Sequence, residues 1–232
     1  MFCGKCGKEN NDEIKFCQNC GSVLESVEHS APLLTKAVTD AGTAFESIPF
    51  SQLILVLAHG SSADLRCYEK GYSAVWQLRE SLGVMSGFVG RNGVSVSKKE
   101  GDGCSPAGLF RLGDAFGTVE KPETKMAYRR ITENSFWVDD PSSCHYNTWV
   151  EGEHKADWSS AEHLSDYPGE YAYAVVIEYN TPARTPGKGS AVFLHCGHHP
   201  TSGCIAVPQP TLLKILKWLE PEKSPGILVA NI

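Results

Sequence analysis

The stretch Gly189-Ser190-Ala191-Val192-Phe193-Leu194-His195 predicts a buried β-strand that ends in a histidine. After a short loop comes Thr201-Ser202-Gly203-Cys204-Ile205-Ala206-Val207, in which a cysteine directly follows a turn of small residues. A thiol is a modest nucleophile until it becomes a thiolate, and a neighbouring imidazole can accept its proton. The two stretches therefore predict a catalytic pair, with Cys204 as the nucleophile and His195 as its general base.

Apolar runs on both sides of this pair predict a mainly β fold. Residues 52–58, apolar after Gln52, form a run typical of a buried strand, and residues 64–70 alternate as its hairpin partner would. Residues 171–180 give the clearest strand signal, and the Pro- and Gly-rich residues 181–189 return the chain antiparallel to it. Further segments complete the prediction: a third strand at 73–78, a helix at 210–219 with one broad apolar face, and a last strand at 227–230.

The composition fits a folded, turn-rich protein, because 41% of the residues are hydrophobic and the chain holds 22 glycines and 13 prolines. A formal net charge of −6 and the lack of any basic run argue against a nucleic-acid partner, since phosphate binding needs concentrated Lys and Arg. No apolar stretch approaches the ~20 residues of a transmembrane segment. Residues 1–5 lack the apolar core of a signal peptide, which predicts a cytoplasmic protein.

Four of the nine cysteines form a separate cluster near the N-terminus. Cys3, Cys6, Cys17 and Cys20 give a C-x2-C-x10-C-x2-C pattern, which brings four thiolates within reach of one Zn²⁺. The alternative, a pair of redox C-x-x-C motifs, belongs beside a βαβ pattern that this sequence lacks. Because four cysteines leave no open coordination position, we predict a structural zinc ribbon over residues 1–24, with docking to a protein partner as its role, and no cofactor for catalysis.

Between the ribbon and the catalytic domain, residues 25–49 differ in composition from residues 50–232. They predict either a partly ordered linker or a weakly amphipathic helix that starts near Ala31 and runs to about Glu46. The catalytic domain is expected over residues 50–232. Within it, residues 159–164 predict a short helix capped by serine.

Cys104 is the one rival nucleophile, because it also lies among small residues. A thiol nucleophile needs a base within hydrogen-bond reach. No histidine accompanies Cys104 locally, whereas His195 precedes Cys204 closely. The sequence therefore favours Cys204.

Three motifs follow one another along the chain: Asp102-Gly103-x-Ser105-Pro106-Ala107-Gly108-x-Phe110, then Phe193-Leu194-His195, then Ser202-Gly203-Cys204-Ile205. Their order resembles that of the L,D-transpeptidase catalytic domain family (YkuD-like, ErfK/YbiS/YcfS/YnhG). The resemblance covers residues 50–232 and implies a β-sandwich with few short helices. It also implies a substrate, the stem peptides of peptidoglycan or muropeptides, and a part in cell-wall biogenesis and cell shape.

The same resemblance implies how the residues act. The Cys204 thiolate would attack the carbonyl after the diamino acid at stem position three, expel D-alanine and form a thioester that an amine of another stem then takes. His195 is implied as the general base, oriented through the backbone carbonyl of Cys196. The amides around Gly203 and Cys204 are implied as oxyanion donors, and Gly203 suits this place because glycine reaches positive φ and presents no side chain to the substrate.

The sequence departs from the commoner form of the family motif in three places, one of which is a shorter gap, with only eight residues between His195 and Cys204. Ser202 occupies the position of a histidine, and Ala206 and Val207 follow the cysteine where the family often has Arg or Asn. His198 or His199 could partly fill the histidine's role, although placement on a surface loop is the interpretation we favour.

Two other functions remain open at this point. With water in place of the amine, the same chemistry gives an L,D-carboxypeptidase; without chemistry, the domain would be a cell-wall-binding module. Peptidoglycan lies outside the membrane, so a chain exported unconventionally would instead act in the extracellular cell wall.

Overall fold

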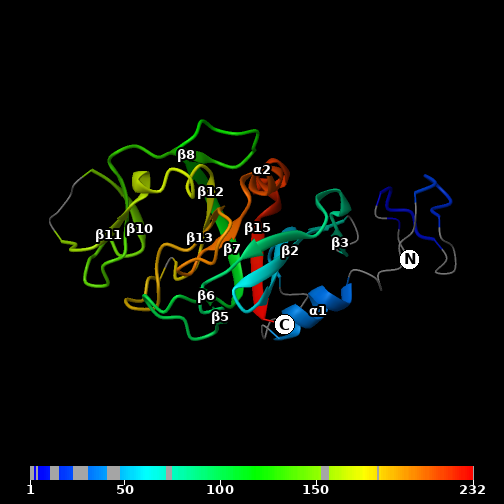
Figure 1. Ribbon diagram of the computed structural model, residues 1–232. Helices are drawn as coiled ribbons and strands as arrows, with labels where there is room; N and C mark the ends of the chain where they lie inside the picture. Colours follow the sequence, from blue (N-terminus) through cyan, green and yellow to red (C-terminus); the bar gives the residue numbers. More distant parts are fainter. Residues whose placement is uncertain are drawn as a thin grey trace.

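Figure 1 shows the structure of the protein, a computed structural model in which a β-rich body carries two helices. The described residues are 3, 5–10, 16–22, 31–40, 48–71, 75–152, 157–181 and 183–231. Part of the predicted linker helix is described as α1 (Ala31–Asp40), and its predicted continuation to Glu46 lies outside the described residues. Ser73 and Ala74 of the predicted third strand also lie outside them.

The body is built on one sheet that closes on itself. Its hydrogen-bonded order is β1-β15-β7-β12-β13-β14-β4-β2, and β2 pairs back with β1 along a hairpin. The mainly β prediction is therefore confirmed, and the two layers of the expected sandwich are halves of one continuous ring. The strands of the ring are β1 (Gln52–His59), β2 (Ser62–Lys70), β4 (Met85–Phe88), β7 (Gly108–Gly117), β12 (Ala174–Ile177), β13 (Phe193–Cys196), β14 (Ile205–Val207) and β15 (Pro225–Asn231).

Strand β1 shows why residues 53–58 are all apolar. Ile54 and Val56 point into the large core inside the ring, whereas Leu53 and Leu55 pack on the other face with α1. All four side chains are fully buried. Each buried aliphatic side chain contributes about 1.5–3 kcal/mol, which favours apolar residues on both faces of the strand. The one buried polar residue of β1, Gln52, donates to the carbonyl of Trp218 and accepts the amide of Glu220.

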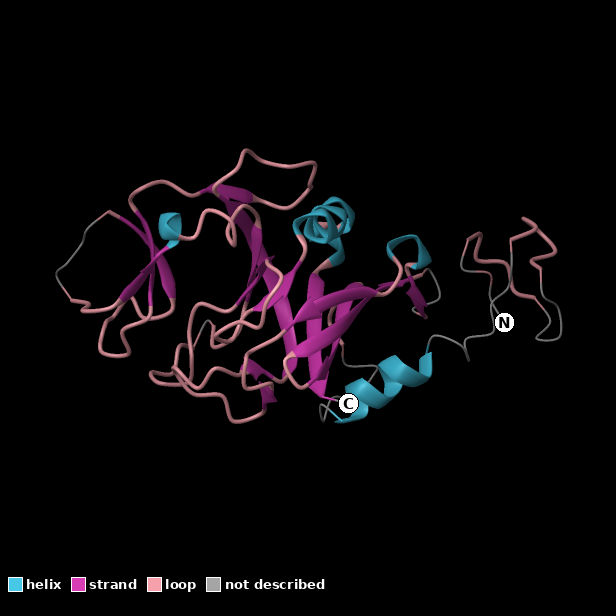
Figure 2. Ribbon diagram, viewed as in Figure 1, coloured by secondary structure: helices cyan, strands magenta, loops and turns pink. Residues whose placement is uncertain are grey.

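Helix α2 (Gln209–Trp218) closes the core beside β13, as the sequence predicts. Leu212, Ile215 and Leu216 recur at helical spacing and enter the same cluster as Leu194 of β13. Figure 2 shows that α1 and α2 are the two long helices of the described chain, the rest being short turns of 3-10 helix.

The predicted hairpin between 171–180 and the histidine strand is present but shorter than expected. β12 and β13 pair antiparallel, with Ala174 opposite His195. The strand begins only at Ala174, because the amide of Tyr171 turns back to donate to the carbonyl of Tyr167. This pairing fixes His195 on a strand with neighbours on both sides.

A small second sheet lies beside the ring and corrects one prediction. β11 (Ala161–His163) pairs with β9 (Ser135–Val138), so residues 159–164 do not form the expected capped helix. Ser159, read from the sequence as a helix cap, gives both its amide and its hydroxyl to the carboxylate of Asp140 instead. The His163 ring also stacks on Phe136, a contact across strands that no local pattern announces.

The remaining elements extend these two sheets. β3 (Trp76–Leu78) adds to the edge of β2, and β8 (Tyr128–Arg130) pairs with β7. A third cluster of apolar residues, including Phe116, Trp137 and Phe193, joins the ring to the small sheet. The other short elements are β5 (Val94–Ser95), β6 (Ser105–Pro106), β10 (Thr148–Glu151) and the 3-10 turns Glu80–Leu82, Leu164–Asp166 and Pro221–Lys223.

Candidate active site

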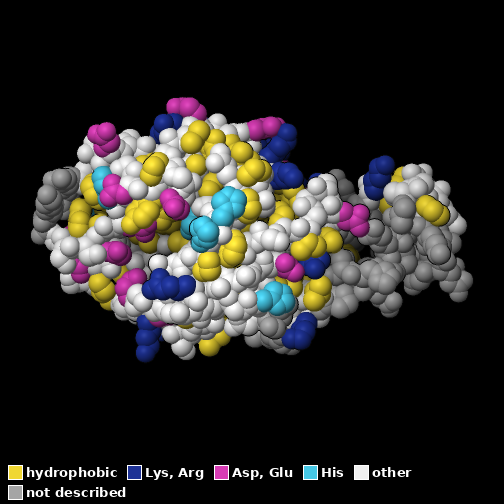
Figure 3. All heavy atoms as spheres, viewed as in Figure 1, with side chains coloured by type: hydrophobic (Ala, Val, Ile, Leu, Met, Phe, Trp, Pro, Cys, Tyr) yellow, Lys and Arg dark blue, Asp and Glu magenta, His cyan; other side chains and the backbone are white. Residues whose placement is uncertain are grey.

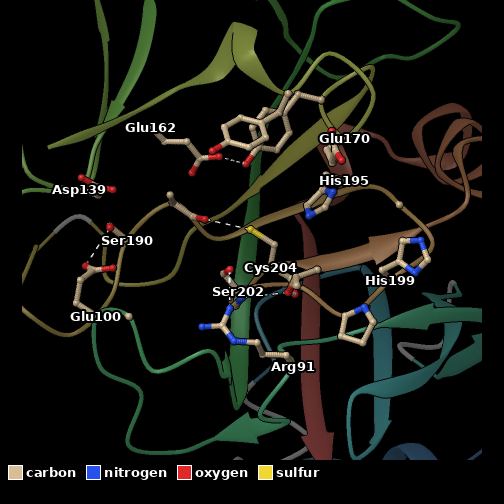
Figure 4. Close-up of a pocket in the computed structure, with 18 of the residues that line it drawn as sticks. Arg91, Glu100, Asp139, Glu162, Glu170, Ser190, His195, His199, Ser202 and Cys204 are labelled. Atoms are coloured by element: carbon tan, nitrogen blue, oxygen red, sulfur yellow. Dashed lines mark hydrogen bonds between the residues drawn. The ribbon is translucent and has the colours of Figure 1, made fainter.

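Cys204 lies in the loop between β13 and β14, one residue before β14 begins (Figure 4). Its Sγ donates a hydrogen bond to the carbonyl of Ala191 at 3.1 Å and accepts one from the amide of Phe193 at 3.3 Å. Ala191 leads into the histidine strand β13, and Phe193 is the first residue of that strand. The thiol is thus fastened to the neighbouring strand that carries His195.

Two hydroxyl groups fix the loop that carries the thiol. Thr201 Oγ1 donates to the carbonyl of Cys204 at 2.6 Å, and Ser105 Oγ donates to the same carbonyl at 3.0 Å. Ser105 is fully buried and in turn accepts the amide of Gly90 at 2.9 Å. Because the carbonyl of Cys204 accepts two hydrogen bonds, the backbone at this residue is held from both sides.

His195 is a buried histidine whose ring is oriented by the backbone. Its Nδ1 lies 2.8 Å from the carbonyl of Cys196, so that nitrogen carries the proton and Nε2 is left as the basic atom. Burial lowers the pKa of His195, and the nearby charge of Glu170 opposes that shift. The ring also meets Tyr171 edge to face, with centroids 5.6 Å apart. At neutral pH this imidazole is uncharged and able to accept a proton.

The thiol of Cys204 is held in its protonated form. Burial raises its pKa to about 12, and the negative charge of Glu162 adds to the shift, while the Phe193 amide and the charge of Lys98 oppose it. Within the described residues, no hydrogen bond joins this thiol to His195, since the proton points at Ala191. In a resting enzyme such geometry is common, and catalytic hydrogen bonds often tighten only when substrate binds.

The two other predicted site residues, Gly203 and Ser202, lie in different environments, one buried and one exposed. Gly203 is buried with φ +155°, and a Cβ there would lie 3.0 Å from the carbonyl oxygen of Cys104. Its amide donates to Thr201 Oγ1 at 3.0 Å, so it is already engaged, whereas the Cys204 amide has no partner among the described residues. Ser202 is exposed, and its hydroxyl accepts a hydrogen bond from Arg91 at 2.9 Å.

Two carboxylates, Glu162 in β11 and Asp139 just after β9, line the cavity on the side of the small sheet and form a wall opposite Cys204. Tyr171 donates its hydroxyl to Glu162, and burial raises the pKa of both groups. Asp139 adds to the shift at Glu162 and accepts a hydrogen bond from Ser160. The negative charge of Glu162 therefore disfavours the thiolate form of Cys204.

These groups surround a single cavity of about 570 Å³. Cys204, His195, Gly203 and Ser202 all line it, as do the exposed His198 and His199. Figure 3 shows histidine side chains gathered near the middle of this face, next to apolar surface. His198 and His199 thus lie on a surface loop, which is the interpretation favoured from the sequence, and they also line the mouth of the cavity.

Cys104 lies outside this lining, 3.5 Å from the carbonyl of Asn92, although its backbone supports Gly203. Sequence reasoning missed several groups that shape the cavity. The support from Thr201 and Ser105, and the wall formed by Glu162, depend on contacts between segments distant in sequence. Ser105 belongs to the first of the three family motifs, but the motif does not indicate that its hydroxyl donates to the carbonyl of Cys204.

The four N-terminal cysteines lie together in the structure. Their Sγ atoms are within 4.8 Å of one another, with Cys3 and Cys20 3.6 Å apart and Cys6 and Cys17 3.5 Å apart. A tetrahedron with Zn–S bonds of about 2.3 Å has sulfur–sulfur edges of about 3.8 Å. The donor set and its spacing therefore fit Zn²⁺. In the described chain, a second group that could hold a metal consists of Cys144, His145 and Asp157, which are all exposed.

Comparison with known proteins assigns a family to both parts of the chain. Residues 58–227 match the family model of the L,D-transpeptidase catalytic domain, named YkuD. Residues 2–24 match a zinc-ribbon domain. Both resemblances that the sequence motifs suggested are confirmed by these matches.

One solved structure is similar at low identity, the helical cell shape determining protein Pgp2 from Campylobacter jejuni. The sequences are 12% identical, the TM-score is 0.43, and the match covers 85% of this chain and 55% of that one. The present chain thus spans about half the length of that protein. No curated protein matches the sequence. The described helices include none that is long and apolar enough to cross a membrane.

Proposed function

Because the chain belongs to the L,D-transpeptidase catalytic domain family, we propose that Cys204 forms a thioester with the acyl group of a peptidoglycan stem peptide. The observation that carries the proposal is the placement of Cys204 and His195 in one cavity, with the histidine ring oriented by the Cys196 carbonyl. A neutral, backbone-oriented imidazole beside a thiol is the arrangement that nucleophilic cysteine chemistry requires.

The first step is transfer of the thiol proton. Since Nδ1 of His195 is engaged with Cys196, Nε2 is the atom that accepts it. The thiol leaves the Ala191 carbonyl by rotation about its Cα–Cβ bond, and the stem peptide takes the vacated side of the cavity. This resting contact keeps the thiol protonated until the substrate is present.

In the second step the thiolate attacks the carbonyl that follows the diamino acid at stem position three. A bond forms between Sγ and the carbonyl carbon, and the negative charge on the carbonyl oxygen meets the amide of Cys204, which has no partner among the described residues. A single well-placed oxyanion donor contributes about 2.7–4 kcal/mol elsewhere. The amide bond to D-alanine then breaks, and Nε2–H of His195 returns its proton to the leaving amine.

The third step decides between transfer and hydrolysis. An amine of a second stem attacks the thioester, His195 accepts its proton, and Cys204 leaves as the thiol's conjugate base and is reprotonated. We propose transfer, which makes the protein an L,D-transpeptidase of peptidoglycan stems or muropeptides. Water in the amine's place would instead give the L,D-carboxypeptidase.

For the N-terminal part we propose one structural Zn²⁺ bound by Cys3, Cys6, Cys17 and Cys20. Four thiolates close the coordination sphere and leave no position for water, so the ion stabilises the ribbon and takes no part in the chemistry. Such a module presents a small folded surface to a protein partner.

Incubation with a disaccharide tetrapeptide, followed by mass spectrometry of the products, tests the catalytic proposal. The expected products are free D-alanine and a crosslinked dimer that has lost one D-alanine. A tripeptide without dimer identifies the carboxypeptidase. If no D-alanine is released and a carbapenem leaves the intact mass unchanged, the proposal is overturned in favour of a binding module.

A further inference from the structure

Lys98 is a buried lysine on the cavity that the proposed mechanism does not use. Only 6% of its surface is exposed, yet it lines the same cavity as Cys204. Its Nζ donates to Asp102 Oδ1 at 2.9 Å and lies 3.4 Å from the carbonyl of Lys99. A buried ammonium loses most of its hydration, and an ion pair or hydrogen bonds must offset the cost of that loss.

Two glycines leave room for this side chain. A Cβ at Gly189 would lie 2.9 Å from Cε of Lys98, and a Cβ at Gly203 would lie 3.2 Å from its Nζ. Both glycines have positive φ, +108° and +155°, so neither position readily accepts another residue. The lysine stem thus passes beside Gly189, and its ammonium ends against Gly203, the residue before the nucleophile.

The two charges of the Lys98–Asp102 pair are held differently. The Asp102 carboxylate accepts the amide of Lys99 at 2.7 Å and the amide of Cys104 at 2.9 Å, which anchors it within its own turn. The ammonium extends from that turn toward the nucleophile loop. The pair is therefore oriented, with its positive end facing Gly203 and Cys204.

The surroundings of Cys204 explain what such a charge can do. Burial and the charge of Glu162 disfavour the thiolate, and Lys98 is the side-chain charge that acts in the opposite direction. Arg91 also lines the cavity, but its guanidinium is exposed and therefore screened by solvent.

We propose that Lys98 is a positioning residue for Cys204, whose ammonium, fixed between Gly189 and Gly203, supplies the positive charge that favours the thiolate of the nucleophile. The inference rests on the proposed function only in taking Cys204 as the nucleophile. The Lys98 ammonium is paired with Asp102 in the resting structure, whereas His195 gains its charge only when it accepts the thiol proton.

The test is the pH dependence of Cys204 alkylation by iodoacetamide, measured on the zinc-loaded full chain by mass spectrometry of the peptide that contains Cys204. Lys98→Met keeps the length of the side chain and removes its charge. We expect the alkylation profile to move upward by about one pH unit, which is roughly a tenfold slower reaction at a fixed pH below both values. Lys99→Met, the same change at the exposed neighbouring lysine, should leave the profile in place.

Asp102→Asn separates charge from structure, because it breaks the same ion pair but retains the cation. If the ammonium acts through its field, this variant moves the profile downward or leaves it unchanged, opposite in sign to Lys98→Met. A purely structural pair would slow alkylation in both variants, and that result overturns the proposal, as does an unchanged profile in Lys98→Met. If Lys98→Met does not fold, the direction of the Asp102→Asn shift decides alone.

Alkylation needs no stem peptide, so the outcome is independent of the proposed reaction. A chain that fails to release D-alanine but shows the predicted shifts keeps the Lys98 inference and loses the function. A chain that turns over tetrapeptide with no shift in Lys98→Met keeps the function and loses the inference.

Discussion

Cys3 in the ribbon and Cys204 in the cavity present the same side chain in opposite electrostatic settings. In the ribbon, the hydroxyl of Ser22, opposed by burial and helped by backbone amides, lowers the pKa of Cys3 to about 6. In the cavity, burial and Glu162 raise the pKa of Cys204 to about 12. A low pKa suits a thiol that binds a metal as a thiolate. A high pKa suits a thiol that is deprotonated only when a base and a substrate are in place.

The difference teaches that the number of cysteines in a site matters less than what surrounds each one. Ribbon cysteines are brought together by chain-local turns, such as the bond from the Gly7 amide to the Cys3 carbonyl. Cys204 depends on Ala191, Phe193 and Ser105, which come from other segments. The ribbon is a local structure and the cavity a tertiary one, so perturbing each in turn tests the distinction.

The largest effect is expected for Cys204, the proposed nucleophile. Cys204→Ala should abolish the carbapenem adduct and lower D-alanine release on the order of 10⁴-fold or more, as removal of a nucleophile does elsewhere. Cys104→Ala should retain the adduct, because Cys104 does not line the cavity. Intact-mass spectra of both variants after carbapenem treatment measure this directly. An adduct that persists in Cys204→Ala would assign the reactive thiol to another cysteine.

The next effect concerns His195. His195→Gln should slow acylation by about 10²–10⁴-fold, the usual contribution of a general base. In the parent chain, burial lowers the pKa of His195 below its ordinary value of 6.5. The imidazole is therefore neutral above that pH, and acylation should decline only as the pH falls below it. A plot of kcat/KM against pH checks this, and a decline already beginning above pH 7 would contradict the assignment.

The free energy of unfolding should also fall at acid pH because of His195. The folded state binds the His195 proton less tightly than the unfolded state, so its contribution is complete above the unfolded pKa of about 6.5. That contribution is lost as the pH falls toward the folded value. Urea unfolding at pH 7.5 and pH 5.5 should show less loss in His195→Gln than in the parent chain.

Much of this arrangement could be predicted from the sequence, because the patterns that indicate it are contained within short stretches of the chain. The ribbon spacing, the apolar run of β1, the helix α2 and the pair His195 and Cys204 each announce themselves within a few residues. A run of apolar residues or a C-x2-C turn can be recognised without reference to the distant segments against which it packs.

What the sequence did not predict depends on contacts made only in the folded chain. Residues 159–164 carry a plausible cap, but Asp140 binds Ser159 and the segment becomes β11. The engagement of the Gly203 amide by Thr201 and the support of Lys98 by Asp102 are side-chain contacts that no periodicity reveals. Recognition of the family supplied the substrate class, which physical patterning alone did not.

A smaller effect is expected from the cavity wall. Glu162→Gln removes the negative charge that raises the pKa of Cys204, so alkylation at pH 8 should become roughly threefold to tenfold faster. The difference should shrink at acid pH, because burial raises the pKa of Glu162 and the parent carboxylate then becomes neutral as well. Glu170→Gln is the matched control, since Glu170 acts on His195. A slower reaction in Glu162→Gln would mean that its bond to Tyr171 matters more than its charge.

The smallest effect on chemistry should come from the ribbon. A chelator should remove its zinc and unfold residues 2–24, because metal binding and folding of such a short segment are one process. Carbapenem acylation of Cys204 should change by less than about twofold, since in the described chain the clusters that pack the ring and the small sheet contain no ribbon residue. Circular dichroism and intact mass, recorded on the same chelated sample, report the two parts separately. Cys20→Ser should reproduce the result without a chelator. If acylation falls together with the zinc, the ribbon contributes to the shape of the cavity, and the contrast between a local and a tertiary cysteine site fails.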